Sequence, residues 1–378
     1  MYPSRRIRNV LAQTMFLAVA AVIVGCDALP VTPLPPGGGG SPQPNPTGQN
    51  PGAFEKGSVI FSLKTDPIQG FTWTRSGAIM EHWVYQPPMT QGRLFAAGVA
   101  LNNRIYAIGG NTFATPALDS VEMLDLPGTG VWTPVAKLSA PRTGIAAAAV
   151  NGKIYAIGGF QPGAPVVGTN EEYDPALNTW TPRAPNPTPR SYARAVTVKD
   201  KIYVIGGSAI VNNVFTDSPL VDEYDPATNA WTPKAPMPVG LSTHAAAELN
   251  GKIHVVSGSV HLEFDPVANS WTPRKPMPTF RDRLGAFSWN GKLFAVGGRT
   301  SGGGVTGIVE EYVPEFDGWN PRQAVLPPNT REAFGYASIG PSFYRLGGIA
   351  PTGQGGNDHD RQAMEYFAFT PVFPFIKD

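Results

Sequence analysis

Arginines at regular distances from tryptophans are the residues of this sequence that are best placed to do chemistry. Arg93, Arg142, Arg190 and Arg281 each follow a tryptophan by ten residues, whereas Leu241 occupies that place in one copy and Arg331 comes two residues later in the last. Arg194 and Arg283 follow shortly after two of them. If a repeating fold brings these seven arginines to one opening, their guanidinium groups could hold a carboxylate or a phosphate through paired hydrogen bonds.

A second interpretation gives the same arginines a structural role. Acidic residues recur where they could form ion pairs with the arginines, namely at Glu171, Glu172, Glu223, Glu310 and Glu311. Buried charges are tolerated mainly when they are paired in this way. The sequence leaves both interpretations open, and it identifies no catalytic residue.

Three other motifs contain residue types that are typical of metal or cofactor sites, but we expect no such site at any of them. His254, His261 and Glu263 have metal-binding side chains, but His254 replaces the tyrosine of a repeated strand, so we expect a packing role. The DHD stretch at 358–360 lies in a glycine-rich segment, where we expect a solvated loop rather than a calcium site. The GGGVTG stretch at 302–307 matches GxGxxG, but it lacks the βαβ setting that a dinucleotide site needs. We therefore expect no metal and no cofactor.

A repeat must position the arginines, because tryptophan recurs along the chain at a nearly constant spacing. Trp83, Trp132, Trp180, Trp231, Trp271 and Trp319 are separated by 49, 48, 51, 40 and 48 residues. The copy at 143–190 contains a small-residue strand, an Asn-Gly turn, the strand KIYAI with a Gly-Gly pair, and strands around EEYDP and NTWTP. Asn-Gly favours a two-residue hairpin because both residues tolerate a positive φ. Four short antiparallel strands repeated six times predict the blades of a β-propeller.

The small-residue strand, the Gly-Gly pair, the YDP turn and the WTP segment together resemble the Kelch repeat. The resemblance covers residues 82–370 and implies an all-β, six-bladed Kelch-type propeller with four antiparallel strands in each blade. The last copy has a strand at 362–369 but no tryptophan after it, so we expect a strand around 82–88 to complete that blade and close the ring. Residues 54–81 form an extension outside the repeat, and residues 371–378 form a C-terminal tail.

The N-terminus predicts export and lipid attachment. Residues 1–25 combine three arginines with a short apolar run, which is the layout of a signal peptide. The IVGC stretch at 23–26 resembles a bacterial lipobox, so the expected lipidation site is Cys26, the only cysteine of the chain. Residues 26–53 are rich in proline and glycine and predict an unfolded tether. We expect an exported protein that is lipid-anchored to the bacterial cell envelope.

Charge and composition exclude one class of partner. The chain has 29 Lys and Arg against 28 Asp and Glu, whereas nucleic-acid-binding proteins usually carry a strong basic excess. We therefore expect no nucleic-acid partner. The protein should be a monomer that meets the membrane through its lipid anchor only.

The resemblance implies two possible functions. Kelch propellers mostly hold a protein or glycan partner with their loops, and the segments 209–219, 300–307 and 350–360 vary over a constant frame. The alternative is an enzyme similar to the Kelch propellers that are sialic acid mutarotases, in which the channel-mouth arginines would hold the sugar carboxylate. A copper oxidase like galactose oxidase is not expected, because its cysteine-linked tyrosine would need the cysteine of the lipobox. We favour a binding module.

Overall fold

The computed structural model describes residues 83–126, 130–164, 166–322, 330–349, 361 and 363–367, together with the backbone of 60–66 and 70–76. The predicted signal peptide, Cys26, the tether, the 350–360 segment and the C-terminal tail lie outside these residues. Within the described residues, no helix is long and apolar enough to cross a membrane.

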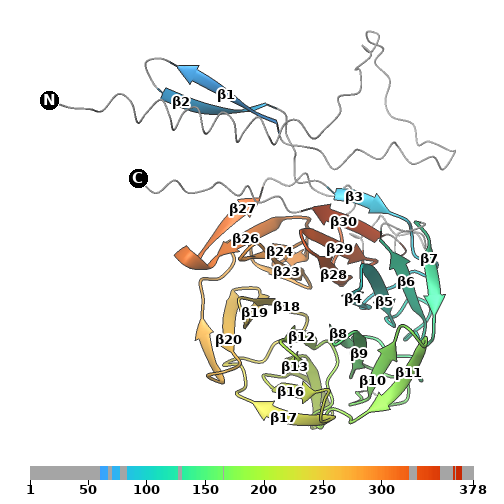
Figure 1. Ribbon diagram of the computed structural model, residues 1–378. Coiled ribbons are helices and arrows are strands. Elements are labelled where there is room, and N and C mark those ends of the chain that lie inside the picture. Colours follow the sequence, from blue (N-terminus) through green and yellow to red (C-terminus); the bar gives the residue numbers. More distant parts are fainter. Residues whose placement is uncertain are drawn as a thin grey trace. The chain divides into compact units, whose positions relative to one another are not determined.

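Six four-stranded antiparallel sheets follow one another around a ring (Figure 1). Blade 1 consists of β4 (Ala97–Leu101), β5 (Arg104–Ile108), β6 (Val121–Asp125) and β7 (Trp132–Val135). Blade 2 consists of β8 (Ala146–Val150), β9 (Lys153–Ile157), β10 (Asn170–Asp174) and β11 (Thr179–Arg183). Blade 3 consists of β12 (Arg194–Val198), β13 (Lys201–Ile205), β16 (Val221–Asp225) and β17 (Ala230–Lys234). Blade 4 consists of β18 (Ala245–Leu249), β19 (Lys252–Ser257), β20 (Val260–Asp265) and β21 (Ser270–Pro273). Blade 5 consists of β23 (Gly285–Trp289), β24 (Lys292–Val296), β26 (Val309–Val313) and β27 (Gly318–Arg322). The prediction of an all-β, six-bladed propeller with four strands in each blade is confirmed.

Blade 6 combines strands from two distant parts of the chain. Its inner strands are β28 (Gly335–Ile339) and β29 (Ser342–Leu346), followed by β30 (Ala363–Phe367). Its outer strand is β3 (Trp83–Gln86), which pairs antiparallel with β30. The strand that precedes blade 1 in the sequence therefore belongs to the last blade in space.

Seven further elements of the described residues lie outside the six four-stranded sheets. A hairpin of β14 (Ser208–Val211) and β15 (Val214–Asp217) is inserted into blade 3, and β22 (Arg281–Asp282) pairs with β25 (Arg299–Thr300) beside blade 5. The short 3-10 helix η1 (Pro314–Phe316) connects β26 to β27. In the N-terminal extension, β1 (Ile60–Asp66) and β2 (Gly70–Ser76) form an antiparallel hairpin.

Asparagine and glycine make the turns between the first two strands of a blade. In blade 2, Asn151 and Gly152 both have positive φ values, of 51° and 74°. Asn250-Gly251 and Asn290-Gly291 repeat this conformation in blades 4 and 5. These residue types reach the left-handed region at low cost, so the turn sets the register in which Val150 faces Lys153.

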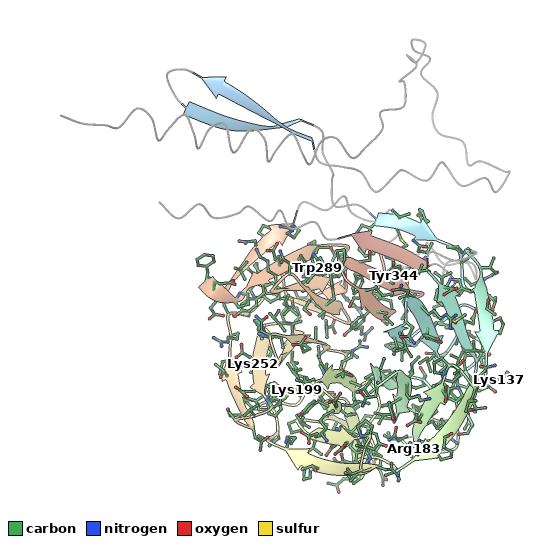
Figure 2. The ribbon with its side chains drawn as sticks, viewed as in Figure 1. Lys137, Arg183, Lys199, Lys252, Trp289 and Tyr344 are labelled. Atoms are coloured by element: carbon green, nitrogen blue, oxygen red, sulfur yellow. The ribbon has the colours of Figure 1, made fainter. Side chains whose placement is uncertain are left out.

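The hydrophobic core lies between neighbouring blades. One buried cluster joins blades 1 and 2 and includes Val99, Tyr106, Ile108, Ile154, Ala156 and Tyr173. Figure 2 shows that side chains fill the space between adjacent blades, with Lys137 and Arg183 on the outside of the ring. Each blade therefore buries its two faces against its neighbours, as a single four-stranded sheet cannot do alone.

In blades 1 to 5, the repeated tryptophan connects the blade to the one before it. In blade 2, Trp180 Nε1 donates a hydrogen bond of 2.8 Å to the Ala136 carbonyl oxygen of blade 1. The same bond joins Trp132 to Pro87, Trp231 to Ala184, Trp271 to Ala235 and Trp319 to Lys275. Tryptophan suits this position because it buries a large ring and still offers one donor.

Candidate functional site

Four of the arginines singled out in the sequence form ion pairs inside the blades. The pairs are Arg93–Glu122, Arg142–Glu171, Arg190–Asp222 and Arg281–Glu310, and none of these residues is more than 3% exposed. Burial lowers the pKa of each of the four guanidinium groups, and the neighbouring carboxylate counteracts this effect. Arg93 Nη1 also donates to the carbonyl oxygens of Gly109 and Ser120, at 2.8 Å each. These guanidinium groups thus hold the second and third strands of their own blade together.

The acidic partners agree only in part with the sequence prediction. Glu171 pairs with Arg142 in blade 2 and Glu310 pairs with Arg281 in blade 5, as expected. Glu172, Glu223 and Glu311 instead pair with Arg183, Lys234 and Arg322 of the outer strands. The reason is strand alternation, since adjacent residues of a strand point to opposite faces of the sheet.

Blade 4 replaces the buried ion pair by two leucines. Leu262 lies opposite Val255, in the register position that Glu310 occupies opposite Ala295 in blade 5. Leu241, which stands at the arginine position, packs against the same hydrophobic cluster as Leu262. In blade 6, Arg331 is buried, and burial together with the positive charge of Arg331 lowers the pKa of Arg345 to about 9.

Six residues with left-handed backbone form the rim of the central channel. They each lie two residues before an innermost strand and have φ between 49° and 62°: Phe95, Gly144, Tyr192, Thr243, Arg283 and Ala333. The main-chain N–H groups of Phe95, Gly144, Tyr192, Arg283 and Ala333 each donate to the carbonyl oxygen of the preceding rim residue. Positive φ is unfavourable for residues other than glycine, so these hydrogen bonds hold the rim in a strained conformation.

Arg194 spans the remaining step of the rim, between Tyr192 and Thr243. Its Nε donates a hydrogen bond of 2.8 Å to the carbonyl oxygen of His244. Its guanidinium carbon lies 5.0 Å from the ring centroid of Tyr336, which belongs to blade 6 on the opposite side of the ring. The Arg194 side chain therefore extends from blade 3 across the channel.

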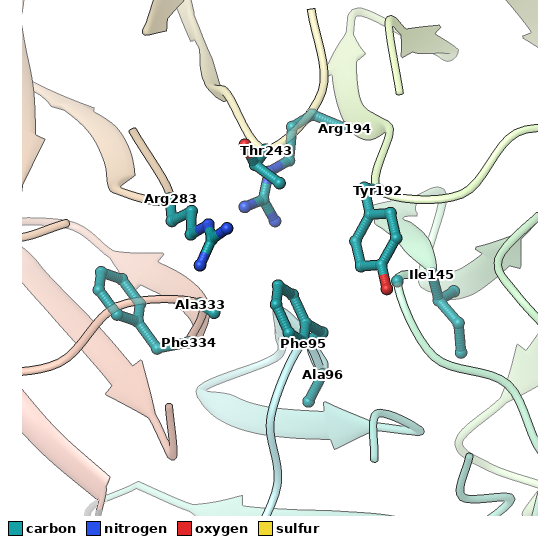
Figure 3. Close-up of a pocket in the computed structure, with 10 residues that line it drawn as sticks. Phe95, Ala96, Ile145, Tyr192, Arg194, Thr243, Arg283, Ala333 and Phe334 are labelled. Atoms are coloured by element: carbon teal, nitrogen blue, oxygen red, sulfur yellow. The ribbon is translucent and has the colours of Figure 1, made fainter. Parts of the chain in front are cut away.

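Arg194 and Arg283 meet at one cavity, which we call the mouth cavity. It is lined by Phe95, Ala96, Gly144, Ile145, Tyr192, Arg194, Thr243, Arg283, Ala333 and Phe334. Figure 3 shows the two guanidinium groups turned toward the same opening, with the rings of Phe95 and Tyr192 beside them. Arg283 Nη1 lies 3.2 Å from Glu332 Oε2. Within the described part of the chain, no carboxylate forms an ion pair with Arg194.

The mouth cavity admits only a small chemical group. The volume that the centre of a water molecule can reach there is about 20 Å³, which is room for roughly one water molecule. The Tyr336 hydroxyl lies 3.4 Å from the main-chain oxygen of Ala246 in blade 4, so an aromatic side chain fills the channel between the inner strands. A carboxylate oxygen could enter the cavity while the rest of its molecule stays outside the rim.

Apart from the two arginines, the residues that line the cavity are uncharged, and so is the neighbouring His244. The rings of Phe95 and Tyr192 meet edge to face, with centroids 5.1 Å apart. Burial raises the pKa of Tyr192, although the positive charge of Arg283 counteracts this, so its phenol stays protonated at neutral pH. Burial, and next the charge of Arg194, lower the pKa of His244 to about 3, so this imidazole is neutral.

The two histidines of the suggested metal cluster bond to each other. His254 Nδ1 lies 2.9 Å from His261 Nε2, and His261 Nδ1 lies 2.9 Å from the Lys275 carbonyl oxygen. Their rings pack between blades 4 and 5, against Tyr312. No group of three His, Cys, Asp or Glu side chains that could hold a metal ion occurs among the described residues. The DHD stretch at 358–360 lies outside those residues.

Comparison with known proteins agrees with this geometry. A family model described as the KLHDC2/KLHL20/DRC7 Kelch-repeats domain matches residues 71–258. The propeller is of the Kelch type. The solved structure titled "Structure of YjhT" resembles this Kelch propeller with a TM-score of 0.62 and 18% sequence identity, over 74% of this chain and 95% of that chain. That likeness concerns the fold. No curated protein matches the sequence.

The rim residues were not recognised from the sequence. Five of them follow the repeat tryptophan by twelve residues and Ala333 by fourteen, so a regular signal exists. Their side chains, however, range from glycine to arginine, and a chemical motif search does not group them. Among the seven arginines predicted to bind a ligand, the structure brings Arg194 and Arg283 together at the mouth cavity. A ligand-binding role for any of the seven stays a prediction.

Proposed function

We propose that this Kelch propeller is a binding module that takes an acidic group of a glycan partner into its mouth cavity. The observation that carries the proposal is the placement of Arg194 beside Arg283, with no carboxylate ion pair to Arg194 among the described residues. Guanidinium groups bind carboxylates through strong, paired hydrogen bonds. The neighbouring rings of Phe95 and Tyr192 supply apolar faces on which the C–H groups of a sugar can pack.

The small size of the cavity favours binding of a single acidic group over enclosure of a whole sugar. Because the cavity has room for roughly one water molecule, an oxygen atom of the carboxylate would enter it and the ring of an acidic sugar would rest on the rim. Loop segments start beside this rim, since Ser191 pairs with Ser208 and Arg281 with Thr300. These loops differ between blades and are therefore suited to select what is attached to the acidic sugar.

Binding of small acidic sugars to Arg194 variants tests this function. Calorimetry with N-acetylneuraminate and glucuronate, and with glucose as the neutral comparison, should show binding of the acids only. Arg194→Ala should weaken that binding about tenfold to a hundredfold, because a hydrogen bond to a charged group contributes about 1.5–3 kcal/mol. Arg194→Lys should restore it only in part, since an ammonium lacks the planar pair of donors. Arg104→Ala, which removes an exposed arginine paired with Asp125, is the matched control and should bind normally. Acid binding that persists in Arg194→Ala would contradict the proposal.

A protein partner is the second candidate, and the β14–β15 hairpin supports it. The side chains of Val211, Val214 and Phe215 are 52%, 61% and 54% exposed, and residues 208–216 contain no charged residue. Exposed apolar strands without charges commonly serve as contact surfaces. Site-specific photocrosslinking from position 215 in cells tests this candidate. A protein partner should give one defined crosslinked adduct.

A mutarotase activity is the alternative that the resemblance implies. It is supported by the arginine pair, by the carboxylate of Glu332 in contact with Arg283, and by the Kelch-type fold. NMR measurement of anomer exchange in N-acetylneuraminate tests it. If the anomers exchange at the uncatalysed rate in the presence of the protein, the mutarotase activity is excluded and the binding function stands.

We further propose that the protein is exported and anchored by lipid at Cys26, on the strength of the IVGC stretch that follows an apolar run. Labelling cells with a palmitate analogue should tag the protein. Cys26→Ser should abolish the label and release the protein from the membrane fraction, and an unchanged distribution would contradict the anchor.

A further inference from the structure

Two charged residues, Arg194 and Arg283, line the mouth cavity, and three further charged residues form a cluster with Arg283. Arg283 contacts Glu332 through Nη1 at 3.2 Å, and its Nε lies 4.0 Å from Asp282. Arg299 Nη1 lies 4.0 Å from the other Glu332 oxygen, and Arg299 is also the cross-strand partner of Asp282. Two arginines and two carboxylates thus form a cluster without net charge.

The fifth charge is Arg194, which lies outside this cluster. Its Nε is bound to the His244 carbonyl oxygen and its guanidinium rests on the Tyr336 ring, both of which are uncharged groups. His244 is fully buried and neutral, because burial lowers its pKa to about 3. The described residues around the mouth cavity therefore carry a net charge of one positive unit.

Glu332 determines this balance. Its side chain is only 8% exposed, it faces Arg283, and its backbone is fixed by hydrogen bonds to Ile349. A buried carboxylate held by two arginines cannot turn away into solvent when a ligand arrives. Any second negative charge on the ligand would be close to this fixed negative charge, and repulsion that involves a largely buried carboxylate is screened less than repulsion between two exposed charges.

We infer that the mouth cavity selects ligands with a single negative charge, such as a sugar carboxylate, over dianions such as a phosphate monoester, and that Glu332 is the residue that sets this preference. The inference rests on the binding function proposed above. A monoanion neutralises Arg194 and leaves the Arg283–Glu332 contact in place. A dianion needs a second unpaired cation, which Glu332 has already taken.

The test compares glucuronate, a monoanion, with glucose 6-phosphate, which carries close to two negative charges at pH 8 because its second pKa is about 6. Calorimetry at low salt should show that the unaltered protein binds glucuronate more tightly. Glu332→Gln should improve glucose 6-phosphate binding roughly tenfold and glucuronate binding much less, because one fixed negative charge is gone. Asp125→Asn, which removes an exposed carboxylate paired with Arg104, is the control and should leave the ratio of the two affinities unchanged.

A second measurement needs no variant of Glu332. Lowering the pH from 8 to 5 converts glucose 6-phosphate to a monoanion, so its affinity for the unaltered protein should approach that of glucuronate. An unchanged preference in Glu332→Gln, or a preference of the unaltered protein for the dianion, would overturn the inference while leaving the binding function standing. If neither sugar acid binds in a manner that depends on Arg194, the binding function fails and the inference fails with it.

Discussion

At the scale of single residues, the role of an arginine in this propeller depends on what the third strand of its blade provides. Arg93, Arg142 and Arg281 find a glutamate there, and Arg190 finds Asp222. Where the third strand provides Leu262, the arginine is replaced by Leu241. The two positions thus change together within one chain, which is expected because a buried charge without its partner is far more costly than an apolar pair.

Blade 4 therefore suggests a double substitution in blade 5. Arg281→Leu or Glu310→Leu alone should destabilise the protein by about 3–5 kcal/mol, because each leaves a buried charge without its partner. The double variant Arg281→Leu/Glu310→Leu reproduces the leucines of blade 4 and should recover most of that loss. Urea unfolding of the three variants measures the coupling between the two sites. Single and double variants whose destabilisations simply add would contradict this account.

At the scale of the blade, blade 4 departs from the others in more than its leucines. It contains three buried histidines, of which His254 and His261 lie on β19 and β20 and His244 precedes β18. Burial is the main cause that lowers their pKa values, to about 3 for His244 and His254 and about 4 for His261. The unfolded chain protonates these histidines near pH 6.5 and the folded chain only near pH 3–4. Blade 4 should therefore be the acid-sensitive part of the ring.

The free energy of unfolding should fall as the pH drops below about 6.5, because the unfolded state then binds more protons than the folded state. The slope contributed by each histidine is at most about 1.4 kcal/mol per pH unit. His254→Tyr/His261→Asn installs the residues that blade 2 has in the same register, Tyr155 and Asn170. Urea unfolding between pH 7.5 and 4.5 should show a shallower pH dependence in this variant. Equal slopes in both proteins would show that other groups cause the acid sensitivity.

At the scale of the whole molecule, one sheet is shared between distant parts of the chain. β3 hydrogen-bonds to β30, and the Trp83 ring packs edge-on against Phe343 with centroids 6.3 Å apart. Because each blade relies on its neighbours to bury its faces, weakening one blade weakens the ring on both sides. An outer strand supplied from the other end of the repeat also leaves no unpaired edge on β30.

Two shortened chains test the contribution of β3. A chain that begins at residue 82 lacks the predicted signal peptide, the tether and the extension with β1 and β2, and it should keep its stability within about 1 kcal/mol. A chain that begins at residue 88 also lacks β3, and it should lose about 3–5 kcal/mol through its strand hydrogen bonds and the burial of Trp83. Thermal unfolding of both chains gives the comparison. Equal unfolding temperatures would show that β3 does not support the ring.

The sequence by itself determined the blade. Asn-Gly turns, short apolar strands such as KIYAI and a tryptophan every 40 to 51 residues are local signals, and they specify four antiparallel strands and their repetition. The expected strands at 153–157, 171–175 and 178–182 correspond to β9, β10 and β11 within one residue. The residues that form a blade are neighbours in the sequence, and local rules about turns and strand alternation are sufficient for them.

Only the tertiary structure decided which arginines face the mouth cavity. Arg190 and Arg194 are four residues apart, yet one is buried against Asp222 and the other reaches across the channel. The rim residues come from six places that are 40 to 51 residues apart, and five of them donate a main-chain hydrogen bond to the rim residue of the preceding blade. Closure of the ring brings these residues together from different blades, and a contact between blades is a matter of three-dimensional distance that local turn and strand rules do not encode.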